Sequence, residues 1–180
     1  MIVKTIFSGF GGQGVLMMGV SLAHSAMNSG YHVTYLPAYG AEVRGGTANC
    51  TVAIADEEIA SPVASEPDYL VALNSPSLFT FQNKLTSGGT IFLNSSIVED
   101  RPNRLDIKVC AVPCGDIAQE LGNIRVANII MMGTFIKKTG IVSTEMYLKS
   151  LESIMGSKKK PVAEVNRKAF AAGFDYVKDK

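Results

Sequence analysis

A glycine-rich loop between the first predicted strand and the first predicted helix constrains the fold of this chain more than any other feature. Residues 2–7 (IVKTIF) are mostly apolar and β-branched and predict a strand, and residues 15–28 (VLMMGVSLAHSAMN) have the length and apolar face of a helix. Between them, residues 8–14 (SGFGGQG) contain the pattern G-x-G-x-x-G. Because glycine has no Cβ, this loop can turn sharply and let an anion approach the free N–H groups at the helix start. The sequence therefore predicts a Rossmann-like start to an α/β fold.

The rest of the chain continues the alternation of strands and helices. Further strands are predicted over residues 32–36, 47–55, 68–73, 90–93 and 107–112. Further helices are predicted over residues 76–84, 116–121 and 125–138, from 143 onward, and over 161–177. Ser75 is the predicted cap of the helix that follows the fourth strand, with Pro76 at its first position. We expect a single α/β domain over residues 1–180, with a mixed, mostly parallel open sheet flanked by helices and a helical C-terminal part.

Composition and charge exclude several classes of protein. The 180 residues carry 17 basic and 16 acidic side chains, a formal net charge of +1, so no basic field exists for a nucleic acid or an anionic membrane. The apolar stretches are far shorter than a membrane span, and the N-terminus does not resemble a signal peptide. Three cysteines are too few for a disulfide scaffold. We expect a soluble cytoplasmic protein, whose 47% hydrophobic content reflects either a well-packed core or a second surface buried against a partner.

The glycine loop by itself leaves its ligand open. A dinucleotide-binding fold usually has an acidic residue at the end of the second strand, about 20 residues further on, where it binds a ribose. Here the second predicted strand ends with Tyr35, Leu36, Pro37 and Ala38, and no G-K-[ST] pattern is present. The loop is then either a site for a phosphate-containing ligand or a tight turn that packs the helix on the strand.

A second motif occupies residues 39–49 (YGAEVRGGTAN). Arg44 could bind a phosphate through two parallel hydrogen bonds, and Gly45 and Gly46 follow it. Thr47 and Asn49 alternate onto one face of the third predicted strand, where their polar ends could reach a ligand or a partner. The alternative is an exposed loop with a surface arginine.

The cysteines and histidines do not form a recognisable catalytic or metal site. Cys110 and Cys114 are spaced C-x3-C and Cys50 lies in a predicted strand, so a four-thiolate cluster lacks a ligand. We expect these cysteines to be small buried residues. His24 and His32 have no evident carboxylate or cysteine partner. The sequence therefore predicts no catalytic residue and no metal ligand in this chain.

Two asparagines follow predicted strands and form a weaker pair of candidates. Asn74 and Asn94 are each followed by a serine at the carboxyl end of a strand. In an open α/β sheet, ligands bind at that edge, so both residues could lie near the glycine loop. The alternative is that they cap helices or form turns.

The order of the motifs resembles the gamma subunit of the 2-oxoacid:ferredoxin oxidoreductases, a family that includes pyruvate, 2-oxoglutarate, branched-chain 2-oxoacid and indolepyruvate enzymes. The resemblance rests on GFGGQGVL, then YGAEVRGGTAN, then DYLVALN and then GGTIFLNSS, and it covers nearly the whole chain. The length, without a fused extension, resembles the 2-oxoglutarate type.

This resemblance implies an activity and a set of partners. Enzymes of the family decarboxylate a 2-oxoacid with thiamine diphosphate, transfer the acyl group to coenzyme A, and pass electrons through iron–sulfur clusters to ferredoxin. Thiamine diphosphate and the clusters are held by other chains, which implies alpha and beta subunits as partners and a ferredoxin-like delta subunit as a further candidate. The gamma subunit is associated with coenzyme A, whose phosphate-bearing portion lies over the glycine loop.

Carried onto this sequence, the resemblance implies a binding site for coenzyme A. The phosphate cradle would consist of Gly9, Phe10, Gly11, Gly12, Gln13 and Gly14, and the neighbouring wall of Arg44, Gly45, Gly46, Thr47 and Asn49. Fused pyruvate enzymes tend to have lysines where residues 42–44 stand here, and only Arg44 keeps a positive charge. A free-standing NAD(P)-binding module and a purely structural subunit stay open as alternatives.

Overall fold

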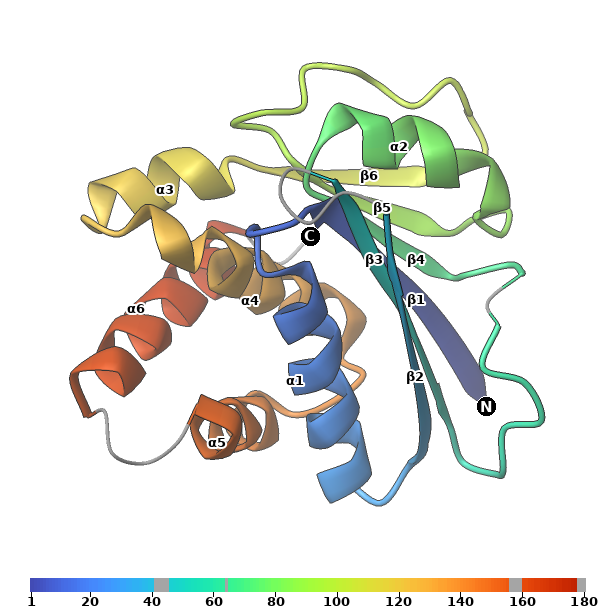
Figure 1. The fold of residues 1–180 in the computed structure, drawn as a ribbon, viewed down its shortest axis with the longest axis horizontal. Helices are drawn as coiled ribbons and strands as arrows, with labels where there is room; N and C mark the ends of the chain where they lie inside the picture. The colour runs from blue at the N-terminus through green and yellow to red at the C-terminus, as the bar shows by residue number, and fades with distance from the viewer. Residues whose placement is uncertain (41–45, 64, 156–159, 178–180) are drawn as a thin grey trace.

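Six strands form one sheet in the order β2-β3-β1-β4-β5-β6 (Figure 1). The computed structural model describes residues 1–40, 46–63, 65–155 and 160–177. The strands are β1 (Ile2–Phe10), β2 (His32–Tyr39), β3 (Thr47–Ala55), β4 (Tyr69–Ala72), β5 (Thr90–Asn94) and β6 (Lys108–Val112). The helices are α1 (Val15–Asn28), α2 (Ser75–Phe81), α3 (Cys114–Glu120), α4 (Ala127–Thr139), α5 (Thr144–Met155) and α6 (Lys160–Tyr176), with 3-10 turns η1 (Gln82–Lys84) and η2 (Ile124–Val126).

Strand β3 gives the sheet its mixed character. It lies between β1 and β2 and is antiparallel to both, whereas β1, β4, β5 and β6 pair in parallel. The carboxyl ends of these four parallel strands therefore lie along one edge of the sheet. The predicted mixed, mostly parallel open sheet flanked by helices is confirmed.

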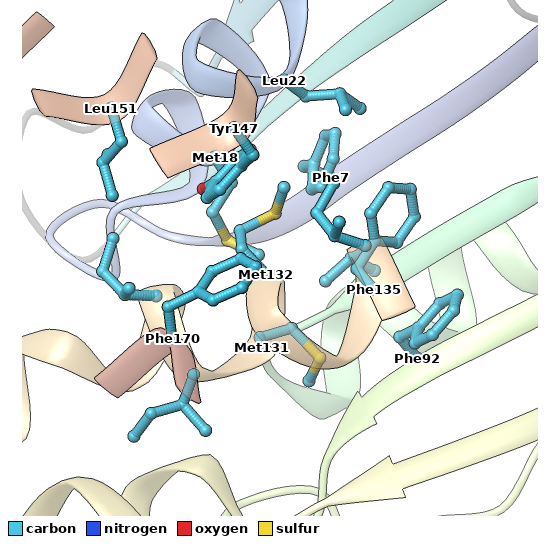
Figure 2. Packing of buried hydrophobic residues seen from close by; sticks show 14 of the residues in the cluster. Phe7, Met18, Leu22, Phe92, Met131, Met132, Phe135, Tyr147, Leu151 and Phe170 are labelled. Carbon is cyan, nitrogen blue, oxygen red and sulfur yellow. The ribbon is translucent and has the colours of Figure 1, made fainter. Parts of the chain in front are cut away.

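The larger core lies between the sheet and the helices α1, α4, α5 and α6 (Figure 1). Figure 2 shows Phe135 of α4 between Phe7 of β1 and Phe92 of β5, with ring centroids 5.6 Å and 5.1 Å away, respectively. Tyr147 of α5 stacks on Phe170 of α6 at 5.2 Å. Burying each such ring contributes about 2 kcal/mol to folding, and this layer ties the C-terminal helices to the sheet.

Helices α4 and α6 touch through their backbones. A Cβ atom at Gly133 would meet the carbonyl oxygen of Phe170, and one at Gly173 would meet the carbonyl oxygen of Ile130. The Thr134 hydroxyl also donates a hydrogen bond of 2.6 Å to the Gly173 carbonyl. Glycine at both positions is therefore required by the close approach of the two helices.

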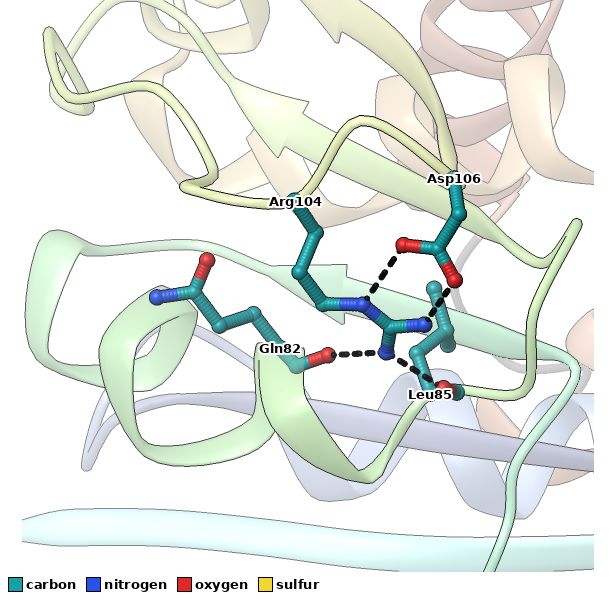
Figure 3. A network of polar contacts seen from close by, with 4 residues as sticks. All are labelled: Gln82, Leu85, Arg104 and Asp106. Carbon is teal, nitrogen blue, oxygen red and sulfur yellow. Dashed lines mark hydrogen bonds and ion pairs between the residues drawn. The ribbon is translucent and has the colours of Figure 1, made fainter.

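A smaller core covers the other face of the sheet beneath α2. Ile6 of β1 faces this core, whereas its neighbour Phe7 faces the larger one, as expected for alternating side chains of a strand. The loop that leads into β6 is tied to this side by Arg104 (Figure 3). The Arg104 guanidinium donates to the carbonyl oxygens of Gln82 and Leu85 and, through Nε at 2.9 Å, to the Asp106 carboxylate.

Two predicted strands were too short because pairing extends them. Strand β1 continues to Phe10, since Ser8, Gly9 and Phe10 pair with β3, so the first part of the glycine loop belongs to a strand. Strand β2 continues through Pro37 to Tyr39, where a loop was predicted. Proline is tolerated there because β2 is an edge strand.

Several helix starts also differ from the prediction. Asn74, not Ser75, caps α2, and its side chain accepts a 2.9 Å hydrogen bond from the Ser77 N–H. Helix α3 begins at Cys114, two residues earlier than predicted. The predicted helix over 125–138 begins with the 3-10 turn η2, because the Asn123 side chain accepts from the Arg125 N–H. None of the helices in the described part of the chain has the length and hydrophobicity needed to span a bilayer.

Candidate functional site

The glycine loop lies at the carboxyl end of β1, beside the carboxyl ends of β4 and β5 (Figure 1). A cavity of about 230 Å³ opens there. Gly12 and Gln13 line it from the loop, Asn94 from the end of β5, and Arg125 and Asn128 from η2 and α4. This is the edge at which open α/β sheets bind their ligands.

The Gln13 side chain stabilises the loop conformation through hydrogen bonds. Its Oε1 atom accepts a 2.6 Å hydrogen bond from the Phe10 N–H, and its Nε2 atom lies 3.4 Å from the Leu73 carbonyl oxygen, to which it donates. Asn74 Nδ2 donates to the same Oε1 atom at 3.5 Å. The side chain thereby links the end of β1 to the end of β4, and the Phe10 amide is not available to a ligand.

Some of the remaining N–H groups of the loop donate hydrogen bonds within the protein, and others do not. The Gly11 N–H donates to the Gly46 carbonyl at 2.9 Å, and the Gln13 N–H donates to the Phe10 carbonyl at 3.1 Å. The first hydrogen bond of α1 runs from the Met18 N–H to the Gly14 carbonyl. Among the described residues, no acceptor faces the N–H groups of Gly12, Gly14, Val15, Leu16 and Met17. These donors, at the positive end of the α1 dipole, are the ones that an anion could use.

The loop conformation requires glycine at two positions. Gly12 has φ of 98° and Gly14 has φ of 76°, both in the left-handed region. A Cβ at Gly14 would meet the Asn128 side chain, whereas one at Gly12 would meet nothing within 4 Å. Gly14 therefore brings α1 close to α4, while Gly12 borders open space.

Three polar side chains reach the cavity from segments far from the loop in sequence. Asn94 and Asn128 are buried, with exposures of 3% and 8%, and Arg125 is exposed. Asn94 Oδ1 accepts from the Ser96 N–H at 3.3 Å, which confirms its predicted turn role, and Asn94 also lines the cavity. Neither the Asn128 amide nor the Arg125 guanidinium has a hydrogen-bond partner among the described residues. These groups add a positive charge and neutral donors to the site.

Arg125 and Asn128 were not among the residues predicted from the sequence. Asn128 is the single polar residue within the apolar run 126–133, and that isolation was a usable indication of a buried polar role. Arg125 carried no such indication, because it lies at a loop-to-helix junction where surface arginines are common.

Only part of the second sequence motif is seen to contact the glycine loop. Arg44 and Gly45 lie outside the described residues. Gly46 contacts the loop through its carbonyl oxygen. Thr47 and Asn49 pair with Phe10 and Ser8 across β1 and β3, so their side chains share the face of Ile6 and α2, and they do not line the cavity. Their role in ligand binding stays a prediction.

None of the three cysteines lines this cavity, and Cys110 is only half-buried, contrary to the prediction that all three are buried. Cys50 and Cys114 are fully buried, and burial raises the pKa of the Cys50 thiol to about 12 and that of Cys114 further still. Both thiols are therefore protonated at neutral pH and unreactive. In the part of the chain that the structure describes, no three His, Cys, Asp or Glu side chains lie near enough to hold a metal ion.

A mostly parallel α/β sheet with unpaired amides at a glycine loop defines a class of α/β protein in which that loop could accept an anion. Such donors could hold and orient a ligand, and no carboxylate, cysteine or histidine lines the cavity among the described residues. Residues 4–176 match the family model described as "Pyruvate ferredoxin/flavodoxin oxidoreductase". The chain belongs to this family.

Relatives with assigned names differ in the oxoacid. The chain is 36% identical over 179 residues to a ketoisovalerate oxidoreductase subunit VorA of Methanothermobacter thermautotrophicus, which covers 98% of this chain and 37% of that protein. It is 34% identical to a 2-oxoglutarate synthase subunit KorC of Methanothermobacter marburgensis, with 94% of each chain covered. The chain thus spans little more than a third of the length of the VorA relative and nearly all of the KorC relative.

Solved structures share the fold. The gamma subunit of a keto/oxoacid ferredoxin oxidoreductase from Geobacter sulfurreducens superposes with a TM-score of 0.82 at 31% identity, covering 96% of both chains. A 2-oxoglutarate:ferredoxin oxidoreductase from Magnetococcus marinus, solved with 2-oxoglutarate, coenzyme A and succinyl-CoA bound, superposes with a TM-score of 0.89. That match covers 99% of this chain and 32% of the other at 20% identity, so it shows the fold alone.

Proposed function

We propose that this chain is the gamma subunit of a 2-oxoacid:ferredoxin oxidoreductase and that its glycine loop binds the phosphate-bearing portion of coenzyme A. The observation that carries the proposal is the group of unpaired N–H donors at Gly12, Gly14 and the start of α1, beside a cavity that Gly12 and Arg125 line. A pyrophosphate is the kind of group that such donors hold. Asn94 and Asn128 would orient the adjoining part of the ligand.

In this proposal the chain binds and orients, and partner chains carry out the chemistry. Coenzyme A supplies the thiol that takes up the acyl group, and the residues of this chain hold its distant end. Alpha and beta subunits would carry thiamine diphosphate and the iron–sulfur clusters, with a delta subunit as a further candidate and ferredoxin as the electron acceptor. We place this complex in the cytoplasm. No catalytic residue is assigned to this chain.

2-Oxoglutarate is the first substrate to test. Three KorC relatives are 33–34% identical to this chain over 94–96% of its length. Ketoisovalerate is the second substrate to test, because the VorA relatives are at least as similar in sequence.

The structure disfavours a dinucleotide as the ligand. In a dinucleotide-binding fold, the second strand lies next to the first, so an acidic residue at its end reaches the ribose. Here β3 separates β2 from β1, and the described part of β2 ends without an acidic residue. A purely structural subunit is the stronger rival, because Gln13 and Gly46 already occupy the amides of Phe10 and Gly11.

Titration calorimetry distinguishes coenzyme A binding, dinucleotide binding and a purely structural role. Coenzyme A and NAD⁺ are each titrated into the chain alone and into the complex assembled with alpha and beta subunits. Ligand at 100 times its dissociation constant stabilises a protein by about 2.7 kcal/mol, which a thermal shift detects. We expect coenzyme A, and not NAD⁺, to bind. The absence of coenzyme A binding to this chain in both forms would leave the structural role.

Gly12→Asp tests the location of the site. Because a Cβ at Gly12 meets open space, the new carboxylate can stand where the phosphate binds, and repulsion of more than ~1.4 kcal/mol weakens coenzyme A binding at least about tenfold. Gly30→Asp is the matched control: Gly30 also has positive φ (89°) and open space, but it lies at the other end of α1. Equal weakening by both variants contradicts the proposal.

A further inference from the structure

A second cavity, of about 850 Å³, lies along the outer edge of the sheet at β6. Residues 108–111, four successive residues of β6, form one side of it. Tyr69 and Thr90, the first residues of β4 and β5, lie at its floor, and Lys138 and Tyr176 reach it from the ends of α4 and α6. The glycine loop is at the opposite, carboxyl edge of the strands, so this groove is separate from the site proposed for coenzyme A.

The backbone of β6 has unused hydrogen-bonding groups on the side of the groove. The Lys108 N–H donates to the Gly89 carbonyl at 2.8 Å, and the Val112 carbonyl accepts from the Ser95 N–H at 2.9 Å. In a parallel pair, every second residue bonds the neighbouring strand, so the groups of Val109 and Ala111 point outward from the sheet. No described residue bonds them. Such an open edge is a template for another strand.

The groove combines positive charge with apolar lining residues such as Phe92 and Val109. Lys108 and Lys138 are exposed and form no ion pair with a described residue, and no aspartate or glutamate of the described residues lines the groove. The Asp68 carboxylate, next to Tyr69 in the chain, instead accepts a 2.8 Å hydrogen bond from the Lys4 N–H. The side chain of Phe92 forms part of the floor. The charge is therefore unmatched within the described chain and complements an acidic group with an aliphatic stem.

We propose that β6 accepts a seventh strand, an extended acidic segment of a partner chain. Its backbone would pair with the free N–H and C=O groups of Val109 and Ala111. Since side chains alternate along a strand, one residue of the incoming segment faces the helices and enters the groove. Its carboxylate meets Lys108 and Lys138. This inference does not depend on which ligand binds the glycine loop.

The test uses two fluorescein-labelled, end-blocked peptides, Thr-Val-Glu-Val-Thr and Thr-Val-Lys-Val-Thr, titrated with the full chain by fluorescence anisotropy. We expect the glutamate peptide to bind about tenfold more tightly than the lysine peptide, because charge complementarity at the groove favours it. A glutamate peptide with N-methylated valines should not bind, because methylation removes its backbone donors. Absence of binding by the glutamate peptide, or equal binding of the N-methylated one, overturns the proposal.

Two variants assign the binding to this edge. Val109→Pro removes an outward N–H and leaves the hydrogen bonds to β5, and proline is tolerated on edge strands, so the fold should persist while peptide binding is lost. Lys138→Glu leaves the backbone intact. It should weaken binding of the glutamate peptide and strengthen binding of the lysine peptide. Unchanged binding in both variants overturns the proposal. If free succinate competes as strongly as the unlabelled peptide, the groove is a site for small anions. If the chain self-associates and Val109→Pro abolishes that association, the occupant of the groove is a second copy of this chain. Either result also overturns the proposal.

Discussion

Two pairs of glycines in this protein serve opposite purposes. Gly133 and Gly173 lie where α4 and α6 cross, and a side chain at either one would overlap a backbone carbonyl. Gly12 and Gly14 lie in the loop between β1 and α1 and have positive φ. Gly12 borders open space, and Gly14 faces the Asn128 side chain rather than a backbone carbonyl.

The difference shows that glycine alone does not indicate a binding site. At the helix crossing, glycine permits two backbones to touch, and no ligand could enter. In the loop, glycine permits an unusual backbone conformation beside a cavity of about 230 Å³, and the amides that it exposes are without partners in the described chain. The space around the missing side chain distinguishes a packing role from a binding role.

The largest effect is expected at the helix crossing. Gly173→Ala places a methyl group against the Ile130 carbonyl, so α4 and α6 must move apart, which we expect to destabilise the protein by about 3 kcal/mol. Urea unfolding followed by circular dichroism measures the change. Ala171→Ser, at an exposed position of the same helix, should change stability by less than about 0.5 kcal/mol. A neutral Gly173→Ala variant would show that the two helices are not held at this distance.

A smaller loss of stability is expected at Gly14. Gly14→Ala combines left-handed backbone strain with contact to the Asn128 amide, together about 2 kcal/mol, but the side chain can rotate away where a backbone carbonyl cannot. In the double variant Gly14→Ala with Asn128→Ser, the stability lost through contact with Asn128 should be recovered, whereas the stability lost through backbone strain should not. A double-mutant cycle by urea unfolding measures the coupling. Strict additivity would mean that Gly14 and Asn128 do not touch.

Gly12→Ala should have a still smaller effect on stability. Only the backbone strain applies, about 1 kcal/mol, because no atom lies within 4 Å of the added Cβ. Coenzyme A binding, measured by calorimetry, should weaken much less than in Gly12→Asp, since no negative charge is added. A large loss of stability in Gly12→Ala would mean that the loop is as closely packed as the helix crossing.

The smallest effect is expected away from both glycine pairs, at the Arg104–Asp106 ion pair (Figure 3). The hydrogen bond from Arg104 lowers the pKa of Asp106 to about 2, below the ordinary value of about 3.9. The pair therefore contributes to stability above pH ~4, and that contribution is lost as the pH falls from ~4 toward 2. An NMR titration of the Asp106 carboxyl group should show its pKa rising toward the ordinary value in Arg104→Gln. Because both groups are in contact with solvent, loss of the ion pair in Asp106→Asn, which keeps the bonds from Arg104 to the Gln82 and Leu85 carbonyls, should change the melting temperature at pH 7 little.

Local sequence was sufficient to predict the bounds of elements that have a clear periodic pattern. The bounds of α1 and β3 agree with the predicted ranges 15–28 and 47–55, because helical periodicity and strand alternation are properties of short segments. The strand–loop–helix start and the family were also evident from motifs near each other in the chain. The cap of α2 was placed one residue late, since Asn74 and Ser75 are equally good caps by residue type and only the direction of the chain leaving β4 selects Asn74.

The sequence by itself determined the fold class and the position of the glycine loop, because these depend on residues adjacent in the chain. Tertiary structure decided what surrounds the loop. Folding brings Arg125 and Asn128 to Gly12 and Gly14 from more than 100 positions away, and the insertion of β3 moves the end of β2 out of reach. It also decided that Gly133 and Gly173 are packing residues, since the distance between two helix backbones is set by both helices and the sheet beneath them.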